Sequence, residues 1–246
     1  MDEDWPSNIG EYKIVDKVLQ TPRSTVYSAF DRVGKRFVIK ESKKDSQPEY
    51  QLLTELDHPN IIKPIDYLHI NDLYYIIFPS AQGGDFLDKL TAEGPLDAEF
   101  VRKMMRDIFE TVAYLHSAGV IHREITLENI LIFYQRGTET YKLGGFSLAI
   151  KSPTSNECCG TIPYIAPEVT EKKEYDNKVD CWNLGIIMYA LFTCTYPYSE
   201  KFEPTEVDYS HIPEEASDLI RHLLCPLPSD RYSADQALKH SFFNEH

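Results

Sequence analysis

The residues from 122 to 131 constrain the fold of this chain more than any other stretch. They read HREITLENIL, a short polar segment followed by an apolar one. They come after a pattern from Leu96 to His116 whose apolar positions recur about every 3.6 residues, which predicts a long core helix. Its apolar positions are Val101, Met104, Met105, Ile108, Val112 and Leu115. A second short segment follows at residues 142–147 and reads KLGGFS.

The composition is typical of a soluble protein with a sizeable core. Apolar residues make up 42% of the chain and aromatic residues 12%, and the length suits one large domain or two small ones. The formal net charge of −14 argues against nucleic acid or an anionic membrane as a partner, because phosphate binding needs a basic surface.

The cysteines and the first residues predict a cytoplasmic protein with little flanking sequence. The five cysteines are odd in number and lack a metal-ligand spacing with nearby histidines, so reduced thiols are expected. The chain opens with the acidic residues 2–4, where a secretion signal would be basic. The longest apolar run, Leu184 to Thr193, is shorter than the ~18–20 residues that a membrane span needs.

The first forty residues predict strands, and the next segment predicts a short helix. Residues 12–19, 25–29 and 36–40 have strand character with turn-like residues between them, and residues 73–78 form a buried-strand run. The leucines at 52, 53 and 56 form a helical stripe. Pro48 suits the first turn of this helix and argues against a longer N-terminal extension of it.

Several of these segments resemble motifs of the protein kinase family. Residues 122–129 resemble the catalytic-loop pattern H-R-D-L-K-P-E-N, and residues 145–147 occupy the place of D-F-G. Residues 159–168, CGTIPYIAPE, resemble C-G-T-x-x-Y-x-A-P-E, and residues 180–185 resemble D-x-W-S-x-G. The resemblance covers about residues 12 to 244, and residues 159–168 and 240–243 are similar to the calcium/calmodulin-dependent kinase group.

The resemblance implies an α+β, two-lobed fold. We expect a short N-terminal extension at 1–11 and a kinase-like domain at 12–246. Its N-lobe, 12–78, would be small, mostly antiparallel β, with a short helix C. A hinge at 79–85 would lead to a larger helical C-lobe at 86–246. Between Tyr198 and Ser217 the chain is acidic and broken by proline, so a helix usual in the family is expected to be lost or vestigial.

The nucleotide-binding positions that the resemblance implies are present, but several are altered. Lys40 would grip the α- and β-phosphates and Asp85 would contact the ribose. The implied positions are Val18, Val26, Val38, Lys40, Pro79, Ala81, Asp85 and Leu131. The three loop glycines of the family are replaced by Leu19, Thr21 and Ser24, Pro22 has no N–H to offer, and Val38 would narrow the adenine slot. ATP binding is therefore expected to be weak or absent.

The catalytic positions depart from the family in their chemistry. Glu124 stands in the base position, and Thr126 replaces a lysine that would steady the γ-phosphate. Asn129 remains as a metal-ligand position, but Gly145 replaces the aspartate that carries the main metal-binding carboxylate. Phosphoryl transfer depends on charge neutralisation and positioning, and Mg²⁺ held by one neutral amide is poorly fixed. We expect no metal site, no required cofactor and no role for Mg²⁺.

The positions that the family uses to hold its fold are retained. The resemblance implies that Lys40 and Glu49 form an ion pair and that Phe78 is a gatekeeper residue. It also implies that His122, Phe146 and Leu53 belong to an internal hydrophobic spine. Further positions with structural roles are Arg123, which would pair with a phosphate, Asp180, which would anchor the catalytic loop, and the pair Glu168 and Arg231. Candidate phosphorylation sites are Ser152, Thr154 and Ser155.

Three functional interpretations stay open from the sequence. In the first, the chain is a pseudokinase that acts by binding a partner kinase or a substrate protein. In the second, it is a weakly active or metal-independent serine/threonine kinase that uses Lys40, Glu124 and Asn129. In the third, it is a diverging copy with no selected role, in which the fold persists.

Overall fold

The computed structural model describes residues 5–198 and 207–244. The chain divides into two compact units, Met1–Gln82 and Gly83–His246, here called the N-terminal and C-terminal units. The division falls within residues 79–85, the segment that the sequence predicts to be a hinge.

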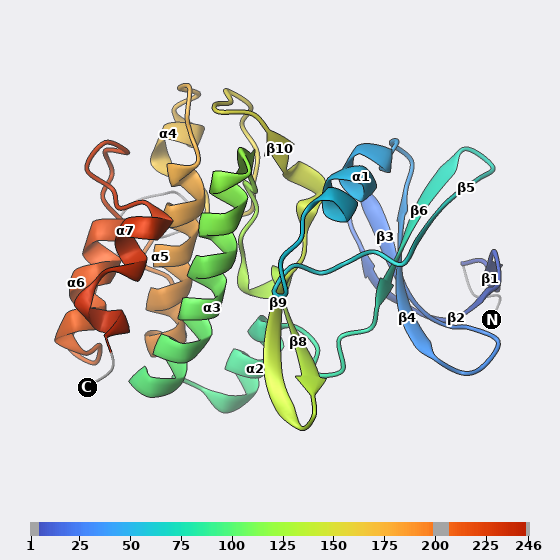
Figure 1. Ribbon diagram of the computed structural model, residues 1–246, viewed down its shortest axis with the longest axis horizontal. Helices are drawn as coiled ribbons and strands as arrows, with labels where there is room; N and C mark the ends of the chain where they lie inside the picture. The colour runs from blue at the N-terminus through green and yellow to red at the C-terminus, as the bar shows by residue number, and fades with distance from the viewer. Residues whose placement is uncertain (1–4, 199–206, 245–246) are drawn as a thin grey trace. The chain divides into compact units, whose positions relative to one another are not determined.

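The N-terminal unit is built on one antiparallel sheet, shown in blue and teal in Figure 1. Its strand order is β1-β2-β3-β4-β6-β5. The bounds of the strands are β1 Asn8–Ile9, β2 Tyr12–Gln20, β3 Ser24–Phe30, β4 Arg36–Ser42, β5 Asp66–Ile70 and β6 Leu73–Pro79.

One face of this sheet holds a hydrophobic cluster of the N-terminal unit. Alternate residues of the strands point to the same face, and the buried ones form one cluster: Ile9, Tyr12, Ile14, Tyr27, Ala29, Phe37, Ile39, Tyr75 and Ile77. The sheet starts at Asn8, before residue 12 where the sequence places its start. Ile9 is buried and pairs with Tyr12, so burial draws these two residues into the sheet.

Helix α1, Gln47–Glu55, is the helix C of the sequence prediction and is as short as predicted. Pro48 lies in its first turn, where its missing N–H leaves no hydrogen bond unmade. Leu53 is the residue of this helix that the core buries. The helix thus places Glu49, one turn earlier, close to its N-terminal end.

The C-terminal unit is mainly helical. Its helices are α2 Phe86–Glu93, α3 Ala98–Ser117, α4 Pro167–Thr170, α5 Lys178–Thr193, α6 Glu214–Leu223 and α7 Ala234–Leu238, with short 3-10 helices at Leu127–Asn129, Phe146–Leu148 and Ser241–Phe243. Strands β8 Ile130–Gln135 and β9 Thr138–Leu143 pair as a hairpin, and β7 Val120–Ile121 pairs with β10 Ile150–Lys151. The α+β fold class predicted from the sequence is confirmed.

Helices α3 and α5 lie side by side in Figure 1 and contact each other. The apolar stripe predicted for α3 is buried. Helix α5 is buried on every face from Val179 to Phe192, which explains why its sequence shows no amphipathic period. Within the described ranges, no helix combines the length and apolar character that a membrane crossing requires.

The strand pairs bring the two short segments of the sequence together. Residues 122–129 connect β7 to β8, and residues 144–149 connect β9 to β10. Because β7 pairs with β10 and β8 pairs with β9, both connections emerge at the same place. The predicted loss of a helix between Tyr198 and Ser217 falls largely on residues 199–206, which lie outside the described residues.

Candidate functional site

Asp180 anchors the backbone of the loop that follows β7. Its Oδ2 accepts a hydrogen bond from His122 N at 2.9 Å, and its Oδ1 accepts one from Arg123 N at 2.8 Å. His116 Nε2 lies 2.9 Å from Oδ2. Burial would raise the pKa of Asp180, but the bond to His116 and the neighbouring histidines hold that pKa below its ordinary value. The carboxylate therefore fixes where residues 122–123 lie.

His122 ties this loop to the segment after β9. Its Nδ1 accepts from Glu124 N at 3.2 Å, so its proton is on Nε2, which donates to Gly144 O at 2.9 Å. The ring also meets Phe146 edge to face, with the centroids 4.5 Å apart. Burial lowers the pKa of His122. The neutral ring is therefore part of the scaffold on which the loop is built.

Glu124, in the base position, has a carboxylate that already accepts hydrogen bonds. Thr161 Oγ1 donates to Oε1 at 3.1 Å, and Ser147 Oγ donates to Oε2 at 3.5 Å. A carboxylate held in this way can accept a proton or form an ion pair with a basic group. The sequence placed Thr161 in the motif of residues 159–168, but no contact with Glu124 was predicted, because the motif does not say which side chain the hydroxyl meets.

Neither Thr126 nor Asn129 brings a charged group to the loop. Thr126, in the place of the family's lysine, is buried, and its short neutral side chain offers no cation. Asn129 Nδ2 donates to Glu124 O at 2.9 Å, so the amide group is turned toward the backbone of its own loop.

Gly145 has a left-handed backbone, and the Asn129 side chain fills the space beside it. Its φ is +74°, a conformation that aspartate and asparagine adopt more readily than other side chains. The obstacle is steric: a Cβ at position 145 would lie closer to the Cγ, Nδ2 and Oδ1 atoms of Asn129 than van der Waals contact allows. In the observed arrangement only glycine fits at this position.

These residues do not fit a magnesium ion. Mg²⁺ demands near-octahedral oxygen ligands and is usually held through carboxylates. Position 145 has no carboxylate, and a Cβ there would clash with the Asn129 amide. Position 145 therefore supplies no ligand to a metal ion.

Arg123 carries a buried guanidinium that organises the segment after β10. It donates to Leu148 O at 2.6 Å, and its Nη1 lies 3.1 Å from Ser155 Oγ, 2.7 Å from Glu157 Oε2 and 3.3 Å from Tyr175 OH. Burial opposes the charge, but the hydrogen bonds to Tyr175 and Glu157 keep the pKa of Arg123 above its ordinary value. The sequence prediction missed Glu157, which is an ordinary loop glutamate by sequence.

The three candidate phosphorylation sites have different surroundings. Ser152 Oγ donates to Thr154 O at 2.8 Å, and Thr154 Oγ1 donates to Glu174 at 3.3 Å. Ser155 Oγ is the hydroxyl of the three that contacts Arg123. Ser155 is also fixed by two backbone hydrogen bonds with Tyr175.

In the N-terminal unit, Lys40 and Glu49 form a close ion pair. Lys40 Nζ lies 2.8 Å from Oε1 and 2.6 Å from Oε2 of Glu49, and both side chains are largely buried. Strand β4 supplies Lys40 and the first turn of α1 supplies Glu49. The ion pair fixes α1 to the sheet.

The loop between β2 and β3 uses its own amides. Thr21 Oγ1 accepts from Arg23 N at 3.2 Å and from Ser24 N at 3.0 Å, while Thr21 N donates to Ser24 O at 2.8 Å. Pro22 has no N–H. The backbone N–H donors of Arg23 and Ser24 are therefore bonded to the loop's own hydroxyl and not to an anion.

The remaining nucleotide-binding candidates divide between the two units. On the sheet, Val26 pairs with Lys40 and Val38 pairs with Phe78, so these residues share one face. The other candidates of the N-terminal unit are Val18, exposed on β2, Pro79 at the end of β6, and Ala81.

Asp85 and Leu131 belong to the C-terminal unit and pair through a β-bridge. Asp85 is the N-cap of α2, and its Oδ1 accepts from Asp88 N at 3.0 Å. Burial raises the pKa of Asp85. Helix capping by itself accounts for an aspartate here, which gives Asp85 a role that needs no ribose.

Glu168 and Arg231 form a buried two-pronged ion pair. Nη1 lies 2.6 Å from Oε1 and Nη2 lies 3.0 Å from Oε2. Arg231 also donates to Cys225 O and Lys178 O, so its remaining donors are satisfied within the C-terminal unit.

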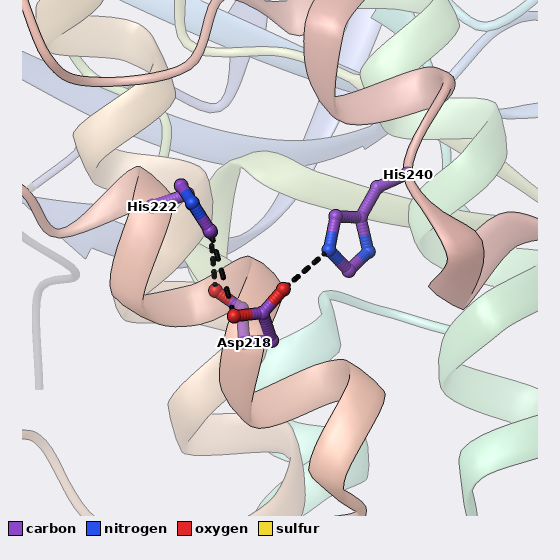
Figure 2. Close-up of side chains that lie close together, drawn as sticks. All are labelled: Asp218, His222 and His240. Carbon is purple, nitrogen blue, oxygen red and sulfur yellow. Dashed lines mark hydrogen bonds and ion pairs between the residues drawn. The ribbon is translucent and has the colours of Figure 1, made fainter.

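A separate cluster of Asp218, His222 and His240 has the residue types of a metal site (Figure 2). His240 Nδ1 accepts from Phe242 N at 3.2 Å, so its Nε2 carries the proton and donates to Asp218 Oδ2 at 2.9 Å. His222 Nδ1 lies 2.9 Å from Asp218 O, which requires a proton there too. In this arrangement the cluster is a hydrogen-bonded link between α6 and the last 3-10 helix.

Comparison with known proteins assigns the chain to a family. The Protein kinase domain family matches residues 9–243. Calcium/calmodulin-dependent protein kinase type 1 of Caenorhabditis elegans is 29% identical over 223 residues, which are 84% of this chain and 64% of that protein. Serine/threonine-protein kinase cds1 of Schizosaccharomyces pombe is 29% identical over 259 residues, 95% of this chain and 56% of that protein.

A human relative, serine/threonine-protein kinase H1, is 30% identical over 220 residues, 82% of this chain and 52% of that protein. The chain spans less than two thirds of the length of these curated relatives. The family match extends over nearly the whole described chain, and the sheet of the N-terminal unit and the helices of the C-terminal unit are the parts of a two-lobed kinase fold. The chain belongs to the protein kinase family.

Proposed function

We propose that the chain is a catalytically inactive kinase-like domain that acts by binding a protein, either a partner kinase or a substrate of one. The observation that carries this proposal is the overlap at Gly145. The position where the family has a metal-binding aspartate has no carboxylate, and a Cβ at that position would clash with the Asn129 amide. Without a fixed cation, the charge that develops in phosphoryl transfer has no partner at this loop.

Two further features support weak or absent ATP binding. In the β2–β3 loop, the amides of Arg23 and Ser24 are hydrogen-bonded to Thr21 Oγ1, so they are not available to bind phosphates. Thr126 is buried and neutral where the family has a lysine. On this proposal the domain requires no cofactor and Mg²⁺ has no role.

The proposed partner is a protein. The net charge of −14 disfavours nucleic acid and anionic lipid, whereas an inactive kinase-like surface retains the shape that kinases and their substrates contact. All five cysteines are free thiols, which supports a reducing compartment, and we propose the cytoplasm.

The proposal is tested by a phosphotransfer assay on the purified chain. Mixed protein and peptide substrates are incubated with labelled ATP and Mg²⁺ or Mn²⁺, alongside an active kinase of the same family as a positive control. We expect no incorporation and no thermal stabilisation by ATP with either ion. Repeatable incorporation that disappears in Lys40→Met would overturn the proposal.

A second candidate, a weak or metal-independent serine/threonine kinase, is favoured by one observation. The ion pair between Lys40 and Glu49 is fully formed, as a lysine that grips phosphates would require. In that case transfer would persist in a metal chelator, would require Lys40, and would fall in Glu124→Gln.

A further inference from the structure

Two histidines and an aspartate from separate parts of the C-terminal unit meet at one surface (Figure 2). Asp218 and His222 are four residues apart on α6, so their side chains lie on one face of that helix. His240 is the N-cap residue of the last 3-10 helix. One nitrogen of each histidine and one carboxylate oxygen of Asp218 all lie within 4.8 Å of one another. The fold therefore gathers three possible metal ligands at one point.

The separations between these atoms are close to those in a four-coordinate metal site. Ligand atoms at ~2.0–2.1 Å from Zn²⁺ in a tetrahedron are roughly 3.4 Å from one another. His240 Nε2 lies 2.9 Å from Asp218 Oδ2, and His222 Nδ1 lies 3.8 Å from Asp218 Oδ1. The side chains of Asp218 and His222 are 54% and 38% exposed, so they have room to make the small rotations that a metal requires and leave it a path from solvent.

Each histidine points a ring nitrogen at Asp218 and is held in that orientation. His222 Nδ1 lies 2.9 Å from Asp218 O, and its ring stacks on Tyr232 with the centroids 4.2 Å apart. The side chain of His240 is 9% exposed, and its Nε2 donates to Asp218 Oδ2. That bond lowers the pKa of Asp218, so the carboxylate is ionised, as a metal ligand must be. The two ring nitrogens and the carboxylate thus converge on one small volume.

We infer that Asp218, His222 and His240 form a binding site for a divalent transition-metal ion of the zinc type. Imidazole nitrogens and a carboxylate suit Zn²⁺, and three such ligands leave a fourth position for water. Mg²⁺ and Ca²⁺ prefer oxygen ligands, so this set of ligands selects against them. The site departs from the sequence prediction of no metal site, which concerned Asn129 and Gly145. It is separate from the loops after β7 and β9 and does not depend on the proposed function.

Metal binding changes the cap of the last 3-10 helix. In the structure His240 Nδ1 accepts from Phe242 N at 3.2 Å. When the metal takes Nε2, the proton of the neutral ring moves through solvent to Nδ1, which can then no longer accept a hydrogen bond. Phe242 N must therefore release His240, while the metal ties α6 to the same segment. Binding exchanges a hydrogen-bonded cap for a coordination bond, so the state of the cap reports on the metal.

Calorimetric titration with zinc chloride tests the site. The parent protein carries Cys158→Ser and Cys194→Ser, because these exposed thiols would also bind zinc. We expect one equivalent to bind. Loss of a group that merely orients a metal ligand weakens binding about 10–100-fold, so His240→Gln should weaken it at least about tenfold. His211→Gln, at an exposed histidine, is the matched control and should bind as the parent does. No binding by the parent, or equal affinity in His240→Gln, would overturn the inference.

The carboxylate is tested in the same parent. Asp218→Asn keeps the shape of the side chain but removes its charge, and zinc affinity should again fall at least about tenfold. Asp235→Asn, at an exposed aspartate of α7, is its control and should change nothing. Magnesium chloride in place of zinc chloride should give no measurable binding. Magnesium affinity equal to that for zinc, or unchanged zinc affinity in Asp218→Asn, would contradict the assignment of ligands.

Amide hydrogen exchange locates the bound zinc without a variant of the site. With zinc, exchange at Phe242 should speed up several-fold relative to exchange at Gln236, because Phe242 N loses His240 Nδ1. Gln236 N is bonded to Ser233, in a cap that zinc leaves alone, and serves as the internal reference. An unchanged ratio of the two rates at saturating zinc would overturn coordination through His240.

Discussion

Arg123 and Glu157 form the contact that links the loop after β7 to the segment after β10. Nη1 of Arg123 lies 2.7 Å from Oε2 of Glu157, and the arginine side chain is 5% exposed while that of the glutamate is 67% exposed. The buried cation therefore has its carboxylate partner at the surface. In a phosphorylated segment, a phosphate group could pair with such an arginine. Here Glu157, a residue of the chain itself, takes that place.

Replacing Glu157 should loosen that segment. Glu157→Gln leaves the guanidinium of Arg123 without a counter-charge, so the chain should lose about 1 kcal/mol of stability. Proteolysis of residues 152–160 should become several-fold faster. Glu171→Gln, at an exposed glutamate paired with Lys173, is the control and should change neither quantity. Equal cleavage of Glu157→Gln and the unaltered chain would contradict a structural role for this contact.

The Lys40–Glu49 ion pair should stabilise the N-terminal unit whether or not nucleotide binds. Lys40→Met leaves the buried carboxylate of Glu49 unpaired, and we expect a loss of about 2 kcal/mol in urea unfolding. The double variant Lys40→Met with Glu49→Leu removes both charges and should lose less than the single variant. A double variant that is at least as unstable as Lys40→Met would show that the unpaired charge is not the cause.

Stability should fall as pH drops below neutrality because His122 is buried and neutral. Burial lowers its pKa in the folded chain, while the unfolded chain titrates near about 6.5. The unfolded state therefore binds more protons, so the contribution is complete above about pH 6.5 and is lost as pH falls toward the folded pKa. Asp180, whose folded pKa is also lowered, adds a second loss below about pH 4.

Urea unfolding at pH 7.5, 6.5 and 5.5 measures this effect. The slope of unfolding free energy against pH should approach, at most, about 1.4 kcal/mol per pH unit for one histidine. His122→Gln should flatten the slope between pH 6.5 and 5.5, whereas the same change at the exposed His211 should not. An unaltered slope in His122→Gln would rule out this residue as the source.

Thr21 should stabilise the β2–β3 loop through its hydroxyl. Thr21→Val keeps the shape of the side chain but removes the acceptor for Arg23 N and Ser24 N. Because the loop is exposed and water can replace the acceptor, we expect a loss of about 0.5–1 kcal/mol. Thr25→Val, in the adjoining strand, is the matched control. No difference between the two variants would argue against the hydroxyl as the organiser of the loop.

Much of the fold could be predicted from the sequence because it depends on local patterns. Periodicity located α3, and Pro48 correctly predicted a short α1. The two-residue strand β1 could not be found in this way, since only the burial of Ile9 and its pairing with Tyr12 define it. The six residues of β9 pair with β8 across a tight turn. No residue outside these two strands and their turn indicates that pairing in the sequence.

The site was harder to predict because its contacts join residues far apart in the chain. The sequence shows that position 145 lacks the family's carboxylate. The structure adds that the Asn129 side chain lies in the space beside Gly145. By sequence Glu157 is an ordinary loop residue and Thr161 is only a motif position, and the fold brings them to Arg123 and Glu124. Asp85 matches a ribose-binding position, yet it caps α2, and a motif cannot separate these two roles.

The buried ion pair between Glu168 and Arg231 sets a limit on how far this chain can be shortened. A chain cut between residues 168 and 231 would keep Glu168, which is 5% exposed, but would lose the only side chain with which it forms an ion pair in the described part of the chain. A carboxylate left alone in a protein interior destabilises by several kcal/mol. Fragments that end in α6 should therefore be recovered as insoluble material, even though they contain every residue of the loops after β7 and β9.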